Sequence, residues 1–267
     1  MLRNVFLKSL RDQGKGLLWW SLGVGGYVAL MMLFYPTVRN SADLINSYME
    51  VWPDAFKTAF MGQFQDLASP AGFLTTYMLS MIGPMLFLIY SIGLGSDAIA
   101  GEEDRGTLDL LLANPVSRGQ VLLHKFAALT AATTVLTAVY GVTLAAGAAA
   151  VAMDVNYGGL LAAIVSTLLL SVCLGALALA TAAASGSKGL GGGVAAAVGV
   201  AAYVVNAFAP MVEGLQPYQK LSLFYLYLGN DPLTNGLSLT HASALVVVTA
   251  VFVAGGVYLF NRRDLAV

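Results

Sequence analysis

Residues 101–118 read Gly101-Glu-Glu-Asp-Arg-Gly-Thr-Leu-Asp-Leu-Leu-Leu-Ala-Asn-Pro-Val-Ser-Arg118, and this charged segment separates two long apolar runs. Neither residues 67–96 before it nor residues 126–153 after it contain any Asp, Glu, Lys or Arg. A run of about 20 apolar residues is long enough to cross a bilayer as a helix. We therefore expect the charged segment to lie in water at a membrane surface, where a soluble partner can reach it.

The composition of the whole chain is that of an integral membrane protein. Of its 267 residues, 58% are hydrophobic and 10% are charged, whereas about 25% of the residues of a soluble domain are charged. The single cysteine, Cys173, lies in an apolar run and cannot form a disulfide within the chain. We expect an all-α fold and one transmembrane domain over residues 1–267. The six expected spans are about 16–35, 72–95, 126–152, 159–184, 190–209 and 242–260.

The distribution of cations predicts the orientation of the spans. An even number of spans places both termini on one side, and the loops richest in Lys and Arg lie in the cytoplasm. With cytoplasmic termini, ten of the 13 Lys and Arg residues lie inside: Arg3, Lys8, Arg11, Lys15, Arg105, Arg118, Lys125, Lys188, Arg262 and Arg263. The outside then holds Arg39, Lys57 and Lys220. We expect a multi-pass protein of a prokaryotic plasma membrane with both termini in the cytoplasm.

Three further segments are amphipathic or broken rather than spanning. Leu2–Leu10 places its apolar side chains on one helical face and its cations largely away from it, which indicates a helix at the membrane interface. The alternative for this segment is an ordinary basic flank of the first span. Leu221–Leu228 is too short to span and predicts a short helix against the outer leaflet. Aromatic residues recur every four positions in the first outer loop and indicate an interfacial helix there: Trp52, Phe56, Phe60 and Phe64.

The charged segment itself has the signals of a short helix from Ser96 to Asn114. Ser96 or Asp97 can cap its start, and the acidic residues that follow suit the positive end of the helix dipole. Pro115 ends it, because the residue before a proline avoids helical backbone angles. A capping box of Ser117 and Gln120 then starts the next helix.

The apolar edge of this helix indicates a docking role. Leu108, Leu111 and Leu112 share one face, and such an edge in a solvated loop can fill a groove on a soluble partner while the charges pair around it. The alternative is a solvated helix that only connects two spans.

The charged segment resembles the first cytoplasmic loop of ABC-2-type transporter permeases, the membrane subunits of ATP-binding cassette exporters. Its matching residues are Glu102, Glu103, Gly106, Thr107, Leu108, Leu111, Leu112, Pro115 and Arg118. Two weaker matches are the N-terminal helix that runs into Leu17-Leu-Trp-Trp20 and the final Asn261-Arg-Arg-Asp-Leu265.

The resemblance implies an assembly of two permease subunits, alike or different, and two ATPase subunits in membrane lipid, without nucleic acid. ATP and Mg²⁺ would bind the ATPases, and this chain would carry no cofactor. The chain would couple to the ATPases through the loop at 96–118, and the coupling residues would be Glu102, Glu103, Arg105, Gly106, Thr107, Leu108, Leu111, Leu112, Pro115 and Arg118. Spans two and five would line the route, for which the polar and aromatic candidates are Thr76, Tyr77, Ser80, Tyr90, Ser91, Tyr203 and Asn206. Pro84 is expected to bend span two. The family exports drugs, antibiotics, peptides, lipids, polysaccharides and ions, and the sequence does not choose among them.

The sequence predicts no catalytic or metal site. It has no Gly-x-x-x-x-Gly-Lys-Ser/Thr phosphate loop, so we do not expect this chain to hydrolyse ATP by itself. A serine protease would need Ser185 and His241 within hydrogen-bond reach, yet they are expected at opposite ends of their spans, roughly 30 Å apart. A metalloprotease built on Glu102 and Glu103 would need an arginine where Thr107 stands, and His124 has no partners for a metal cluster.

The remaining alternative is an ion-coupled secondary transporter, or another polytopic membrane protein without an ATPase partner. Secondary transporters often place ionisable groups at mid-membrane. No expected span contains an Asp, Glu, Lys or Arg, so ion coupling lacks an obvious site.

Overall fold

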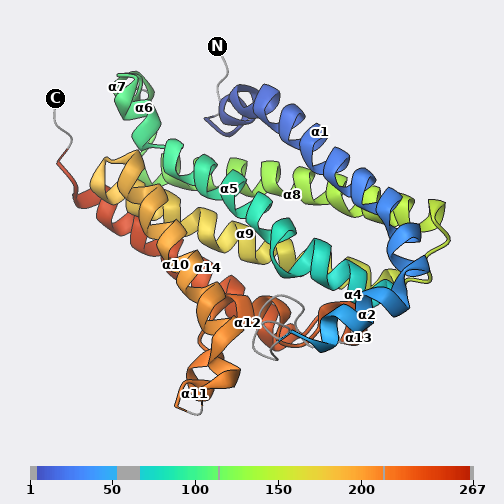
Figure 1. Cartoon of the computed structure of the whole chain (residues 1–267). Coiled ribbons are helices and arrows are strands. Elements are labelled where there is room, and N and C mark those ends of the chain that lie inside the picture. Colours follow the sequence, from blue (N-terminus) through green and yellow to red (C-terminus); the bar gives the residue numbers. More distant parts are fainter. Residues whose placement is uncertain (1–4, 53–66, 114, 213, 265–267) are drawn as a thin grey trace.

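The computed structural model describes residues 5–52, 67–113, 115–212 and 214–264. These residues form helices and no strand (Figure 1). Within them, six helical segments are long and apolar enough to cross a membrane, which confirms the expected number of spans. The spans are α1 (Val5–Asn40), the broken span two at 70–97, α8 (Arg118–Ala150), α9 (Tyr157–Ser185), α10 (Lys188–Phe208) and α14 (Leu239–Arg262).

Helix α9 forms the centre of the bundle. It packs against α5 (Ile82–Asp97), α8, α10 and α14 (Figure 1). Its sequence is rich in Ala and Gly, and small residues allow helix backbones to approach closely in a membrane. The Gly175 position shows this, because a Cβ placed there would lie 3.1 Å from the carbonyl oxygen of Ser91 on α5. The neighbouring spans are therefore held to α9 by close backbone contact.

Helix α1 runs along α8 on the outside of the bundle. It is continuous from Val5 to Asn40, so the described part of the expected N-terminal interfacial helix is not a separate element. The physical reason is local: no proline or helix-ending cap interrupts the chain before Pro36, and the amphipathic segment simply continues into the span. Val24, Val28 and Met32 bury the inner face of α1 against the core.

The two ends of the bundle differ in what they carry. The described ends of the chain lie beside α6 (Ala100–Asp104) and α7 (Leu108–Leu112), at what we call the loop end (Figure 1). The opposite end carries the short elements α2 (Ala42–Glu50), η2 (Ala209–Met211), α11 (Gln216–Gln219), α12 (Leu223–Leu228) and α13 (Pro232–Asn235). Helix α12 confirms the short helix expected at 221–228. Of the predicted aromatic stripe, Phe56, Phe60 and Phe64 lie outside the described residues.

Candidate functional site at the loop end

The segment between spans two and three forms two short helices rather than the single helix that we expected. Helix α5 continues to Asp97, α6 follows, and Gly106 separates α6 from α7 with a positive φ of 66° that glycine adopts easily. Ser96 lies within α5 and donates a hydrogen bond back to the carbonyl of Gly93, so it does not cap a new helix. The predicted helix start at Ser96 or Asp97 is wrong because the helix of span two continues through both residues, beyond its apolar run.

Three of the four leucines of α7, Leu108, Leu111 and Leu112, turn toward the protein. Leu108 is 3% exposed and packs with Ile99, Leu122 and Phe260, with Leu112 at the edge of the same cluster; Leu111 is 7% exposed. The prediction of an outward leucine edge is therefore wrong. The break at Gly106 lets α7 fold against the bundle, where burial of these side chains is favourable.

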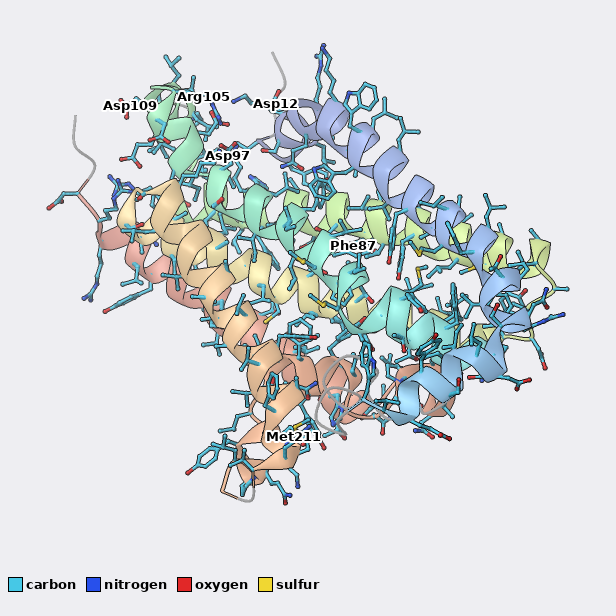
Figure 2. The ribbon with its side chains drawn as sticks, viewed as in Figure 1. Asp12, Phe87, Asp97, Arg105, Asp109 and Met211 are labelled. Carbon is cyan, nitrogen blue, oxygen red and sulfur yellow. The ribbon has the colours of Figure 1, made fainter. Side chains whose placement is uncertain are left out.

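A different set of side chains forms the outer surface of the loop. Leu110 is 72% exposed, and it lies on the face of α7 opposite Leu108 because the two residues are about 200° apart around the helix. Asp104, Arg105 and Asp109 are exposed beside it, and Figure 2 shows Arg105 and Asp109 at this edge of the molecule. Any partner that approaches the loop meets one apolar side chain surrounded by charges.

Glu102 connects the loop to two spans. Its side chain is buried, and its carboxylate accepts hydrogen bonds from Lys125 on α8 at 2.7 Å and from Lys8 on α1 at 3.2 Å. The hydroxyl of Thr107 donates to the other carboxylate oxygen. Burial by itself raises the pKa of this carboxyl, but the hydrogen bonds from Lys125 and Thr107 and the charges of both lysines outweigh it and hold the pKa at about 2. Glu102 is therefore an ionised structural centre and not an exposed rim residue.

A second carboxylate fastens the end of span two to α10. Asp97 accepts a hydrogen bond from Lys188 at 2.7 Å and contacts Arg105 at 3.4 Å. These side chains are more exposed than Glu102, with 52% of Lys188 and 53% of Arg105 accessible. The contact joins the end of span two and the loop just after it to Lys188, which lies 91 residues further along the chain than Asp97.

The C-terminal end of α14 is tied to the same loop. Arg263 pairs with Glu103 and donates a second hydrogen bond to the carbonyl of Ala183 on α9. Arg118 at the start of α8 donates to the carbonyls of Phe260 and Arg263. The loop is thereby connected to α9 and α14 as well as to α1, α8 and α10. We call this set the charged junction: Lys8, Asp97, Glu102, Glu103, Arg105, Thr107, Arg118, Lys125, Lys188 and Arg263.

Sequence reasoning found only part of the charged junction. It selected Glu102, Glu103, Arg105, Thr107 and Arg118, but as contacts for a partner. It missed the role of Lys8, Asp97, Lys125, Lys188 and Arg263, which it counted only for orientation or capping. Pro115 is exposed beyond α7, and Gly106 makes the turn.

Span two is irregular below this junction. It consists of α4 (Pro70–Phe73), a π-helix η1 (Leu74–Ser80) and α5, with the helical backbone broken at Met81 (φ −134°, ψ −66°). Pro84 follows shortly after and has no N–H to donate to the preceding turn. Gly83 is required here, because a Cβ at that position would lie 1.7 Å from the carbonyl oxygen of Met78.

Three tyrosines from three other helices cover the end of the π-helix. Tyr140 on α8 donates its hydroxyl to the carbonyl of Met78 at 2.8 Å, and Tyr227 on α12 donates to that of Leu79 at 3.0 Å. A third hydroxyl, from Tyr27 on α1, donates to the carbonyl of Tyr77. Buried carbonyls without partners are costly in a membrane, and these hydroxyls satisfy them. The spacing of the tyrosines in the sequence gave no sign of this convergence.

The residues predicted to line a route lie in different surroundings within the described part of the chain. Ser80, Tyr90 and Ser91 are buried in the packing of span two. Tyr203 stacks edge-on against Phe224 at 5.3 Å, and Asn206 accepts a hydrogen bond from Gln219. Thr76 and Tyr77 are half-buried on the π-helix. Their role in transport stays a prediction.

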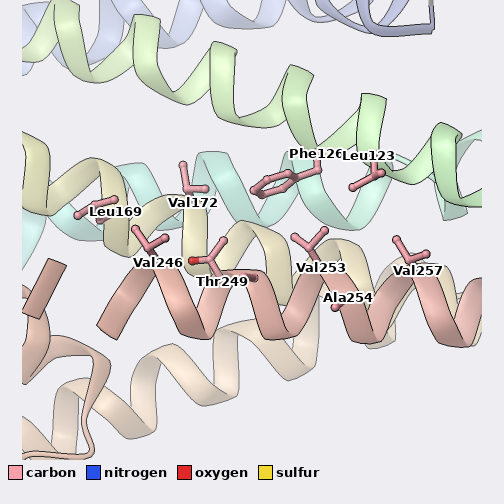
Figure 3. A pocket seen from close by; sticks show the side chains of 10 residues that line it. Leu123, Phe126, Leu169, Val172, Val246, Thr249, Val253, Ala254 and Val257 are labelled. Atoms are coloured by element: carbon pink, nitrogen blue, oxygen red, sulfur yellow. The ribbon is translucent and has the colours of Figure 1, made fainter. Parts of the chain in front are cut away.

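The bundle also has an apolar groove of about 610 Å³ between α8, α9 and α14 (Figure 3). Phe126, Val172 and Val253 are among its lining residues, and none of the predicted route residues belongs to it. Thr249, its one polar lining residue, donates its hydroxyl to the carbonyl of Leu245 on its own helix. Among the described residues, no group of three or more His, Cys, Asp or Glu side chains is placed to hold a metal ion.

Comparison with known proteins agrees with this architecture. The probable ABC transporter permease protein NosY of Pseudomonas aeruginosa is 42% identical over 71 residues, and that of Stutzerimonas stutzeri is 41% identical over 68 residues. The aligned stretches cover 27% and 26% of this chain, and only 25% and 24% of those two proteins.

A family match covers far more of the sequence. Residues 4–265 match the family described as ABC-2 family transporter protein. The match includes all six spans and the charged junction. The chain therefore belongs to the ABC-2 family of transporter proteins.

Proposed function

We propose that this chain is the permease subunit of an ATP-binding cassette exporter and that the loop at 98–117 receives the motion of a separate ATPase subunit. The observation that carries the proposal is the charged junction. Glu102 of this short loop binds Lys8 of α1 and Lys125 of α8, and Glu103 pairs with Arg263 at the end of α14. Arg105 contacts Asp97, which also binds Lys188 of α10. A push on the loop would therefore act on several spans together, as transport by a membrane subunit requires.

The contact with the ATPase is made by the outer surface of α7 in this proposal. Leu110 provides the apolar anchor, and Asp104 and Asp109 provide the charge around it. The complementary ATPase surface is an apolar pocket with a basic rim. Leu108 and Leu111, which the sequence predicted as docking residues, are instead buried within this chain.

The cation distribution supports a cytoplasmic loop end. Of the described cations, only Arg39 and Lys220 lie at the opposite end. By the positive-inside rule, this distribution favours a cytoplasmic location for both termini and the loop of a plasma-membrane protein. ATP and Mg²⁺ would bind the partner ATPases, and two copies of the permease, alike or different, would complete the exporter.

The ion-coupled alternative is weakened by the tyrosines of span two. In secondary transporters, backbone carbonyls at broken helices coordinate the coupling ion. Here the carbonyls of Met78 and Leu79 at the break already accept hydrogen bonds from Tyr140 and Tyr227. A coupling ion at these two carbonyls would therefore have to compete with the tyrosine hydroxyls.

The test is a double substitution of the outer surface, Leu110→Ala with Asp109→Lys, in the complex purified with its ATPase. Burial of one leucine contributes about 1.5–3 kcal/mol, so the loss should weaken ATPase retention at least about tenfold and stop transport. Leu161→Ala, which shortens a leucine on α9 that is 62% exposed, is the matched control. A variant that inserts normally, keeps its ATPase and transports at the wild-type rate would refute this docking surface. An ion gradient that drives transport without any ATPase would refute the exporter itself.

A further inference from the structure

The apolar groove between α8, α9 and α14 has walls that all belong to helices long and apolar enough to cross a membrane (Figure 3). On α14 its lining residues begin at Val246 and end at Val257. Eleven residues of helix measure about 16 Å. In a hydrocarbon core about 30 Å thick, each leaflet contributes about 15 Å. The groove is therefore about as long as one leaflet is deep.

The groove is too narrow for a helix. Its volume of about 610 Å³, spread over about 16 Å of length, gives a mean cross-section of about 38 Å². A helix with its side chains is about 10–12 Å wide, which corresponds to about 80–110 Å². A span of a second copy can lie across the groove but cannot fill it. An extended chain of methylene groups fits, because apolar carbons pack about 4 Å apart.

The walls of the groove suit a hydrocarbon and not water. Thr249 provides the one hydroxyl among the lining residues, and it donates to the carbonyl of Leu245 on its own helix. An ordered water needs about two to four polar partners, which these walls do not supply. Apolar walls that face an empty space lose dispersion contacts. Because the groove lies along membrane-spanning helices, the bilayer itself supplies a hydrocarbon chain to fill it.

Polar side chains follow the groove at its loop end. Helices α8 and α14 come close there, since a Cβ added at Gly119 would lie 3.2 Å from Val257 and 3.8 Å from the amide nitrogen of Asn261. Asn261 is exposed, and its amide can donate two hydrogen bonds. The guanidinium of Arg262 lies 4.3 Å from the centre of the exposed Tyr258 ring, and aromatic rings and cations at the end of a span are typical of the membrane–water interface. We call Asn261, Arg262 and Tyr258 the polar rim.

We propose that the groove binds one acyl chain of a phospholipid from the leaflet at the loop end. The chain lies along α14 from Val257 to Val246, between Phe126 of α8 and Val172 of α9. The polar rim donates hydrogen bonds to the ester and phosphate oxygens of the same lipid. Because the chain contacts three spans at once, it completes the packing of α14 against the bundle. The site requires no ATPase and is independent of the proposed function.

The experiment photolabels the full purified chain in bilayer discs of phosphatidylcholine. A small fraction of the lipid carries a diazirine midway along one acyl chain, and mass spectrometry locates the labelled residues. Ala254→Phe and Ala250→Phe are the diagnostic variants, because both alanines are exposed and line the groove, so that a ring there occupies the groove without displacing a packed side chain. Ala138→Phe, at an exposed alanine of α8 outside the groove, is the matched control.

In the wild type we expect at least about tenfold more label on the groove residues than on two reference positions that face lipid, which corresponds to a preference of about 1.4 kcal/mol. The references are Val251, 62% exposed on the same helix, and Leu33, 74% exposed on α1. The two groove variants should lose this excess, and Ala138→Phe should keep it. The unfolding midpoint of each variant confirms that it is folded.

Three results would overturn the proposal. Label spread evenly over the groove and the reference positions would mean that only bulk lipid passes the groove, and the wild type alone decides this point. An excess that persists in both folded groove variants would place the bound chain elsewhere. A groove that is labelled in discs with one copy but protected in discs with two copies would assign it to a second copy of this chain.

Discussion

Span two and the loop that follows it are fastened to the same two helices, α1 and α8, at two levels and by different chemistry. At the loop end, Lys8 of α1 and Lys125 of α8 bind the carboxylate of Glu102. Near the π-helix, Tyr27 of α1 and Tyr140 of α8 donate hydroxyls to backbone carbonyls. The connection at the loop end is ionic, and the connection near the π-helix is neutral.

The difference follows the solvent that each level meets. A charge inside the hydrocarbon region carries a large desolvation cost, whereas a tyrosine hydroxyl can satisfy a carbonyl without any net charge. At the loop end water is near, and a buried carboxylate is tolerated because two ammonium groups and a hydroxyl surround it. The comparison shows that α1 and α8 can be joined to the same part of the chain by charge near the surface and by neutral hydrogen bonds inside the bundle.

The largest loss of stability is expected from Gly83→Ala, close to the neutral hydrogen bonds near the π-helix. The new Cβ would meet the carbonyl oxygen of Met78 at 1.7 Å and would lie 3.0 Å from the hydroxyl of Tyr140, which binds that carbonyl. Backbone must move to accept it, which would break the contact between α5 and the π-helix. We expect a loss of about 5 kcal/mol or more, in the exceptional range for one substitution. Thermal unfolding in detergent measures it.

Gly93→Ala is the control on the same helix. A Cβ at Gly93 meets nothing within 4 Å. The change should be neutral or stabilise the protein by up to about 1 kcal/mol, because alanine favours helix over glycine. Equal unfolding midpoints for the two variants would contradict the tight junction at Gly83.

The next largest loss of stability is expected from Glu102→Gln, which removes the charge that binds Lys8 and Lys125 at the loop end. The neutral amide leaves Lys125 buried with its charge unpaired, and breaking a buried pair in this way costs about 3–5 kcal/mol. Glu103→Gln is the matched control, since Glu103 and its partner Arg263 keep 25% and 17% of their side chains exposed. Its loss should be clearly smaller. A Glu102→Gln midpoint no lower than that of Glu103→Gln would show that the two lysines do not depend on this carboxylate.

The sequence predicted the spans well and the junction poorly, for a physical reason. Apolar runs of spanning length are a local property, so six helices follow from the sequence alone. The burial of Leu108 and the pairing of Glu102 with Lys8 depend on how distant helices meet, and they share no local pattern. The leucine spacing was read correctly as one face, but the sequence does not say whether that face turns to a partner or to the bundle.

The π-helix in span two was equally hidden. Pro84 indicated a bend, and the backbone break lies at Met81, close to it. The donors that make the break stable lie on three other helices, at Tyr27, Tyr140 and Tyr227. A tyrosine in an apolar run looks the same in sequence whether its hydroxyl binds a carbonyl or has no partner.

Tyr140→Phe tests whether the tyrosine hydroxyls stabilise the carbonyls of the π-helix. It removes one hydroxyl and leaves the carbonyl of Met78 buried without that partner, so we expect a loss of about 1–3 kcal/mol. Tyr90→Phe is the control, because the buried hydroxyl of Tyr90 has no hydrogen-bond partner. That variant should match wild type or exceed it slightly in unfolding midpoint. If both variants lose the same stability, the carbonyl contact does not explain the Tyr140 effect.

The smallest loss of stability is expected from Lys188→Gln, because the ion pair of Lys188 with Asp97 is exposed to solvent. Lys188 and Asp97 form a close pair at 2.7 Å, but about half of the lysine side chain is exposed. Exposed ion pairs contribute about 0–1 kcal/mol, and at 1 M salt the screening length falls to about 3 Å. Asp97 also keeps Arg105 as a partner, which limits the loss further. The difference in unfolding midpoint between Lys188→Gln and wild type should thus be small at low salt and vanish at 1 M, whereas the Glu102→Gln difference should persist because Lys125 is buried. If salt removed both differences equally, the distinction between an exposed and a buried part of the charged junction would be lost.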